Sequence, residues 1–195
     1  MIDTLEKFNE YMEQTPPSVL PKMLLHACCG PCSSAVIEKL KRHFDITILY
    51  FNPCIYPESE YELRFAQFEK LGVKQIIKYS YNHQEYLDFV KGLETEKEGG
   101  KRCYLCYKER ITKTYELAKQ LGFSYFSTTL SISPHKNSAW INEIGLSLSD
   151  EETSFVYSDF KKKDGYLQSI KLSKEYNLYR QDYCGCEFSI QKKEE

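Results

Sequence analysis

No apolar run in this 195-residue chain approaches the roughly 20 residues that a helix needs to cross a bilayer. The N-terminus also lacks the basic segment followed by an apolar stretch that marks an export signal. No internal repeat or low-complexity linker interrupts the chain. These absences argue against a membrane-bound or exported protein, and we expect a cytoplasmic one.

The chain has no large excess of charge of either sign, since its formal net charge is -2. This balance neither demands nor excludes a nucleic-acid partner, because phosphate binding depends on where Lys and Arg cluster. The length suits one well-buried domain. We predict an N-terminal appendage helix within residues 1–21, broken at Pro16 and Pro17, and a single domain over residues 22–195.

From residue 22 onward, short apolar runs alternate with helical spacing of apolar residues. The expected strands cover 23–27, 46–51, 75–78, 123–129 and 154–157. The expected helices cover 33–43, 59–71, 83–91, a stretch from about 103, 134–146 and 164–176, and the Ser59 to Glu62 spacing fits a helix start. Such alternation predicts an α/β fold with a parallel sheet flanked by helices.

Cysteine is abundant: the chain has eight, although disulfides rarely persist in the cytoplasm. Seven of them form three groups, which are Cys28, Cys29 and Cys32, then Cys103 and Cys106, then Cys184 and Cys186. Seven clustered thiols exceed the four that one tetrahedral zinc needs, and thiolates suit iron–sulfur clusters. A thioredoxin-like dithiol at Cys29 and Cys32 would leave the other two cysteine groups without a function. The remaining Cys54 is expected to be a small buried residue.

The first cysteine group follows the first predicted strand, where open parallel sheets bind their ligands. Cys32 would then lie at the start of a helix, whose partial positive charge should lower the pKa of its thiol. Cys103 and Cys106 lie at another expected helix start and should gain the same effect. Two helix ends are therefore expected to converge on one metal site.

Other candidate residues have a structural and a functional interpretation. His26 ends a buried strand, so it is either structural or a ligand or proton donor. Arg64 either pairs with Glu60 one turn earlier or contacts a ligand. Lys136 lies in a hydroxyl-rich stretch that either contacts an anion or a ribose or simply caps helices. Arg180 ends a basic, tyrosine-rich stretch that is either a solvated helix face or an RNA contact.

Five motifs, taken in order, resemble the QueH family of epoxyqueuosine reductases. They are HACCGPCS from His26, FNPCIYPESEYELR from Phe51, EGGKRCYLC from Glu98, STTLSISPHKN from Ser127 and YRQDYCGC from Tyr179. The resemblance spans roughly Leu24 to Phe188. It implies a Rossmann-like sheet of the adenine-nucleotide alpha-hydrolase type, in which Cys-rich loops replace the phosphate-binding loop, so ATP is not expected.

The resemblance also implies a [4Fe-4S] cluster with an additional mononuclear iron nearby. The implied cluster ligands are Cys28, Cys29, Cys103, Cys106, Cys184 and Cys186, with Cys32 as a further metal ligand. Some relatives carry Asp in place of Cys32, and the usual loop has Asn in place of Cys54. Both differences bear on how many thiols ligate here.

The implied activity is reduction of epoxyqueuosine to queuosine at the wobble position of tRNA, the final step of queuosine biosynthesis. Electrons would come from an external one-electron donor such as ferredoxin or flavodoxin. The candidate proton donors are His26, Asp182 and Tyr183. The candidate substrate contacts are Arg64, Lys136 and Arg180.

Two alternatives remain open from the sequence. A noncatalytic zinc-binding RNA module would use the cysteines only to hold loops together, and it predicts a colourless protein. A cluster-dependent tRNA thiolase would share the fold class, but the missing glycine-rich phosphate loop counts against it.

Overall fold

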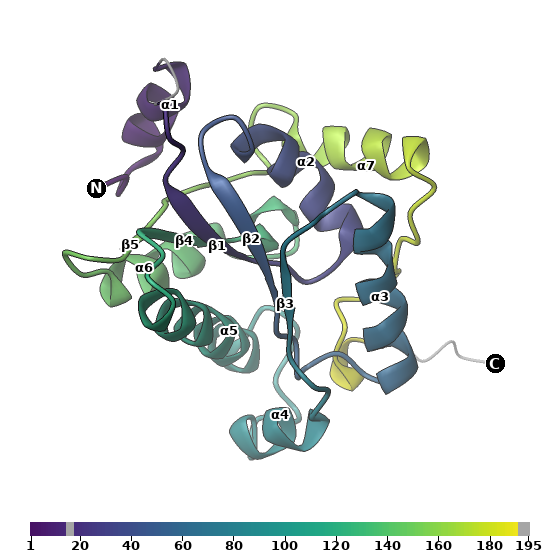
Figure 1. The fold of residues 1–195 in the computed structure, drawn as a ribbon. Helices are drawn as coiled ribbons and strands as arrows, with labels where there is room; N and C mark the ends of the chain where they lie inside the picture. Colours follow the sequence, from purple (N-terminus) through teal and green to yellow (C-terminus); the bar gives the residue numbers. More distant parts are fainter. Residues whose placement is uncertain (15–17, 191–195) are drawn as a thin grey trace.

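The computed structural model describes residues 1–14 and 18–190 and contains one five-stranded parallel sheet. The strand order is β3-β2-β1-β4-β5 (Figure 1). The strands are β1 (Lys22–His26), β2 (Asp45–Tyr50), β3 (Ile76–Lys78), β4 (Tyr125–Thr128) and β5 (Ser154–Phe155). The predicted parallel α/β fold is confirmed.

Helices cover both faces of this sheet. One face carries α2 (Gly30–Leu40), α3 (Glu58–Lys70) and α7 (Gly165–Glu175), and the other carries α5 (Lys101–Gln120) and α6 (Ser138–Leu148) (Figure 1). The short α4 (His83–Phe89) lies beyond the sheet. In β1, Met23 and Leu25 pack toward one helical layer and Leu24 toward the other. A strand buried on both faces explains the continuous apolar run in the sequence.

The N-terminal helix α1 (Leu5–Glu13) packs against the core. Thr4 caps it, and Phe8 is buried against the ring of Phe160. The backbone N–H of Tyr157 also donates to the carbonyl of Ile2 at 2.8 Å. The expected break at Pro16 and Pro17 lies outside the described residues.

Several helices begin at other positions than the spacing predicts. Helix α2 begins three residues early, at Gly30, because the Cys29 sulfur accepts the N–H of Cys32 and serves as the N-cap. Helix α3 begins at Glu58, one residue before the expected start near Ser59, but the predicted cap at Ser59 is wrong because Pro57 precedes the helix with no side-chain cap.

The helix expected from Pro134 begins later than predicted. A short 3-10 turn, η1 (Thr129–Ile132), follows β4, and α6 starts at Ser138 behind the Asn137 cap. A second 3-10 turn, η2 (Glu187–Ser189), lies near the end of the described chain. None of the helices within residues 1–14 and 18–190 combines the length and the apolar character needed to cross a membrane.

Candidate metal centre

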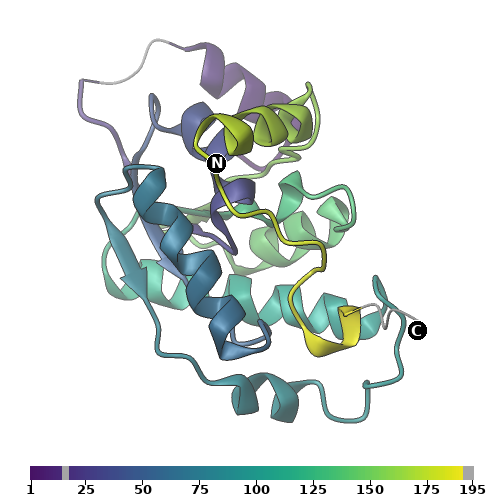
Figure 2. The same cartoon turned by 90° about the vertical axis from the view of Figure 1, so that its right-hand side faces the viewer.

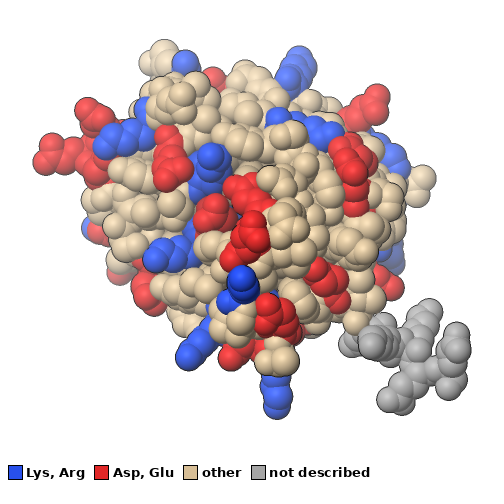
Figure 3. Space-filling view, turned by 90° about the horizontal axis from the view of Figure 1, so that it is seen from below, with Lys and Arg blue, Asp and Glu red and all other residues tan. Residues whose placement is uncertain are grey.

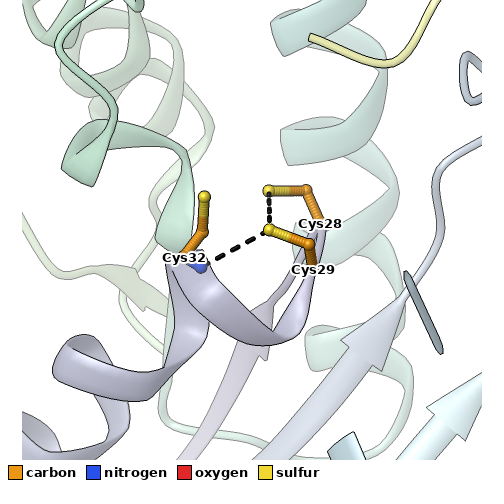
Figure 4. A group of neighbouring side chains, drawn as sticks. All are labelled: Cys28, Cys29 and Cys32. Atoms are coloured by element: carbon orange, nitrogen blue, oxygen red, sulfur yellow. Dashed lines mark hydrogen bonds between the residues drawn. The ribbon is translucent and has the colours of Figure 1, made fainter. Parts of the chain in front are cut away.

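Three cysteines meet at the carboxyl end of β1, where the sequence predicts the site. The Sγ atoms of Cys28, Cys29 and Cys32 all lie within 4.8 Å of one another (Figure 4). We call these three residues the loop thiols. They converge because Cys28 and Cys29 end the loop after β1, while Cys32 lies in the first turn of α2. The loop thiols therefore derive from a five-residue stretch.

The proton affinities of the loop thiols differ. Hydrogen bonds from Cys29 and Cys32 hold the pKa of the Cys28 thiol well below its usual value. The hydrogen bond with Cys28, together with burial, raises the pKa of Cys29 to about 12. The hydrogen bond with Cys28 and burial also raise the pKa of Cys32. The prediction that the helix end lowers the pKa of Cys32 is wrong, because the neighbouring sulfurs and burial outweigh the helix dipole. Cys28 is the thiol that favours the thiolate.

The other five cysteines, which we call the assembled thiols, come from separate segments: Cys54, Cys103, Cys106, Cys184 and Cys186. Cys54 follows β2 and shares a hydrogen bond with Cys106, which lowers the pKa of Cys54 to about 6 with help from the charge of Arg110. The Arg110 Nη2 atom donates to the Cys106 Sγ at 3.1 Å.

The expected lowering of the pKa values at the start of α5 is also wrong. Burial raises the pKa of Cys103, although its sulfur accepts the backbone N–H of Gly99 at 3.3 Å. The hydrogen bond with Cys54, and then burial, raise the pKa of Cys106. Cys54 is buried, as expected, and in its pair with Cys106 it carries the lowered pKa. The sequence analysis did not identify Arg110, although its position one helical turn after Cys106 could have indicated a contact with that sulfur.

A buried arginine holds the segment of Cys184 and Cys186. The side chain of Arg64 is 1% exposed, and its Nε atom donates to Glu60 at 2.7 Å. Its Nη1 atom donates to the carbonyl of Cys184 at 3.0 Å. A side chain at Gly185 would meet this guanidinium at 3.1 Å, and φ there is +142°. The side chain of Arg64, a candidate substrate contact, is therefore buried inside the fold. Its N–H groups donate to Glu60 and to the Cys184 carbonyl.

His26 likewise lies inside the fold. Its Nδ1 atom is 2.8 Å from Thr128 Oγ1, and its Nε2 atom is 3.1 Å from the carbonyl of Phe51 and 3.2 Å from Asn52 Oδ1. The carbonyl and amide oxygens require Nε2 to donate, so Nδ1 accepts from the Thr128 hydroxyl. Burial, and then Arg110, lower the pKa of His26 to about 4. The ring is neutral and serves as a structural link.

A cavity of about 410 Å³ opens beside the loop thiols. Cys28, Cys32 and Cys184 line it together with four other site candidates, which are Lys136, Arg180, Asp182 and Tyr183. Burial opposes the charge on Lys136, but the nearby Cys184, Cys28 and Cys32 together outweigh burial and raise its pKa. The fold therefore brings sulfur, positive charge and acidic groups to one hollow.

The fold and this centre define a Rossmann-like α/β protein with a cysteine-rich site at the carboxyl edge of its sheet. The family model described as "Epoxyqueuosine reductase QueH" matches residues 23–192. The chain belongs to this family, whose name is that of an oxidoreductase.

Curated relatives named epoxyqueuosine reductase QueH are similar over most of the chain. The protein of Streptococcus pyogenes serotype M1 is 42% identical over 88% of this chain and 71% of its own length. That of Staphylococcus epidermidis is 38% identical over 88% and 77%. That of Thermotoga maritima is 33% identical over 89% and 92%.

A solved structure, the U34-tRNA thiolase NcsA from Methanococcus maripaludis with its [4Fe-4S] cluster, shares the fold. The TM-score is 0.51 at 11% identity, over 96% of this chain and 68% of the thiolase. At this identity the likeness concerns the arrangement of the sheet and helices alone.

Proposed function

We propose that this chain reduces epoxyqueuosine to queuosine at the wobble position of tRNA, using an iron–sulfur cluster and an adjacent iron. The observation that carries the proposal is the cavity itself: sulfurs from two cysteine groups line it together with Lys136 and Arg180. Membership of the QueH family supports the activity. With tRNA as its substrate, the protein is proposed to act in the cytoplasm.

The donor set fits the proposed metal group. Soft thiolates are the ligands of iron–sulfur clusters, and three lie within 4.8 Å of one another. The proposed ligands are Cys28, Cys29, Cys32, Cys103, Cys106, Cys184 and Cys186. When bound, the cluster supplies single electrons and the iron supplies a Lewis acid for the epoxide oxygen. Arg110 and Lys136 lie close enough to the thiolates to offset their negative charge.

Lys136 and Arg180 are proposed to bind phosphates on either side of the modified nucleoside. Arg180 is held in place because its Nη1 atom donates to Ser173 Oγ at 3.0 Å. By contrast, the face in Figure 3 intersperses Lys and Arg with Asp and Glu. That face presents no continuous basic surface, and an anticodon loop with a splayed wobble base is expected to approach the cavity that Lys136 and Arg180 line.

Removal of the epoxide oxygen as water consumes two electrons and two protons. Tyr183 and Asp182 line the cavity and are the proposed proton donors. Burial, and then the charge of Glu60, raise the pKa of Tyr183 to about 12, so its hydroxyl stays protonated at neutral pH. His26 is omitted because it is fully buried, does not line the cavity and bonds within the protein through both ring nitrogens. The Tyr183 hydroxyl donates to the carbonyl of Tyr56, but Tyr183 lines the cavity.

Anaerobic purification with iron and sulfide analysis tests the proposal, followed by an assay on tRNA that contains epoxyqueuosine. Brown protein with about four or more irons per chain is expected. It should form queuosine with reduced ferredoxin or flavodoxin as the electron donor. A colourless zinc protein that stays inactive after iron–sulfur reconstitution would contradict the proposal and favour the RNA-binding module.

A further inference from the structure

Gln181 places its side-chain amide against the most buried of the loop thiols. The residue lies in the segment that runs from α7 to η2, drawn in yellow in Figure 2. It lines the cavity between Arg180 and Asp182. Its Nε2 atom donates to the Cys29 Sγ at 3.2 Å, across 152 positions of the sequence. This contact is tertiary, since no local turn brings the two residues together.

The other end of the same amide has no partner. The Oε1 atom of Gln181 is buried and accepts no hydrogen bond from the residues that the structure describes. An unpaired buried carbonyl costs free energy, and a residue with a purely structural role would be expected to satisfy it. The amide is instead oriented so that its N–H reaches the sulfur. The contact with Cys29 is therefore the interaction that the arrangement preserves.

We propose that Gln181 tunes the electron affinity of the metal centre through its N–H bond to the Cys29 sulfur. The inference rests on the proposed function in that Cys29 is taken as a metal ligand. An N–H donor withdraws negative charge from a ligating sulfur and stabilises the reduced centre, which raises the reduction potential. Cys29 is 0% exposed, so water cannot take the place of the amide.

The Cys29 sulfur receives one N–H from a side chain and one from the backbone. The Cys106 sulfur receives its donor from Arg110, and the Cys103 sulfur receives the backbone N–H of Gly99. The backbone N–H of Cys32 reaches Cys29 at 3.4 Å, a longer contact than that of the amide. Gln181 also lines the cavity, whereas Cys29 itself does not.

The test compares two isosteric variants, Gln181→Met and Gln181→Glu, with wild type after iron–sulfur loading. Gln181 is not a ligand, so both variants should keep the iron content of wild type. The reduction potential should fall in Gln181→Met because the donor is lost. It should fall further in Gln181→Glu, which also adds a negative charge. Gln168→Glu, an exposed change of the same type on α7, should leave the potential unchanged.

A second measurement uses the metal-free protein loaded with Co²⁺ alone. Loss of the N–H bond raises the energy of the sulfur electrons, so the sulfur-to-cobalt absorption band should move to longer wavelength in Gln181→Met. This band can be read even if the protein takes up no cluster or reduces no epoxyqueuosine, which separates failure of this inference from failure of the proposed function. A potential and a cobalt band equal to those of wild type in Gln181→Met would overturn the inference.

Discussion

The loop thiols and the assembled thiols reach the same edge of the sheet by different routes. The loop thiols occupy Cys28 to Cys32, and the β1 to α2 turn alone brings them together. The assembled thiols come from the loop after β2, from α5 and from the segment before η2. Two buried arginines contact this set: Arg64 donates to the carbonyl of Cys184, and Arg110 donates to the sulfur of Cys106. The cysteine-rich site is therefore half local and half tertiary.

A short chain of hydrogen bonds joins the two sets. His26, at the end of β1, bonds to Asn52 Oδ1, and Asn52 Nδ2 donates to the carbonyl of Ala27 at 2.9 Å. The Nη1 atom of Arg110 reaches the same Asn52 oxygen at 3.5 Å, while its Nη2 atom donates to Cys106. Asn52 thus links the loop thiols to the assembled thiols.

The largest expected effect is on iron content, and it separates a proposed ligand among the loop thiols from Cys54 among the assembled thiols. Cys29→Ser should lose most of the bound iron after anaerobic reconstitution, because a hydroxyl is a poor substitute for a buried thiolate. Cys54→Ser should keep it, since Cys54 is outside the proposed ligand set. Iron per chain measures both, and an equal loss in Cys54→Ser would show that Cys54 is a ligand.

Removal of Arg64 should destabilise the assembled set. Arg64→Met leaves Glu60 buried without its cation, which should lower the free energy of unfolding by roughly 3 to 5 kcal/mol. Lys78→Met, at an exposed ion pair with Glu62, is the control and should cost less than about 1 kcal/mol. Urea unfolding of the metal-free protein measures both. Equal losses would show that the burial of Arg64 contributes nothing specific.

The pH dependence of the free energy of unfolding should reveal the lowered pKa of the buried His26. Its pKa is about 4 in the folded protein against 6.5 for a free side chain, so the unfolded chain binds the proton more readily. The free energy of unfolding should therefore fall as the pH drops from 6.5 toward 4, by roughly 3 kcal/mol in total. His26→Gln should remove this part of the slope. Exposed His135→Gln should retain it, and a slope that survives in His26→Gln would contradict the assignment.

Asn52→Ala should have the smallest effect of the four. It removes the bonds that Asn52 makes to His26 and to the Ala27 carbonyl, and should cost about 2 kcal/mol of unfolding free energy. Asn9→Ala, in α1, should stay within about 0.5 kcal/mol. Thermal or urea unfolding of the metal-free variants compares them. No difference between the two would show that the sets are held independently.

The sequence predicts the elements better than their exact starts. Alternating apolar runs place all five strands to within a few residues, because strands buried on both faces need continuous apolar stretches. The start of α2 differs because a cysteine sulfur, outside the usual set of capping groups, caps the helix at Cys29. The start of α3 differs because Pro57, and not Ser59, occupies the cap.

By itself, the sequence determined the α/β class, the three cysteine groups and the place of the first group after β1, since these follow from periodicity and local spacing. Only the tertiary structure decided which thiol favours the thiolate and that Arg64 and His26 lie inside the fold. It also decided that Gln181 meets Cys29. The physical reason is that pKa values and buried hydrogen bonds depend on neighbours up to 152 positions away, which spacing along the chain does not encode.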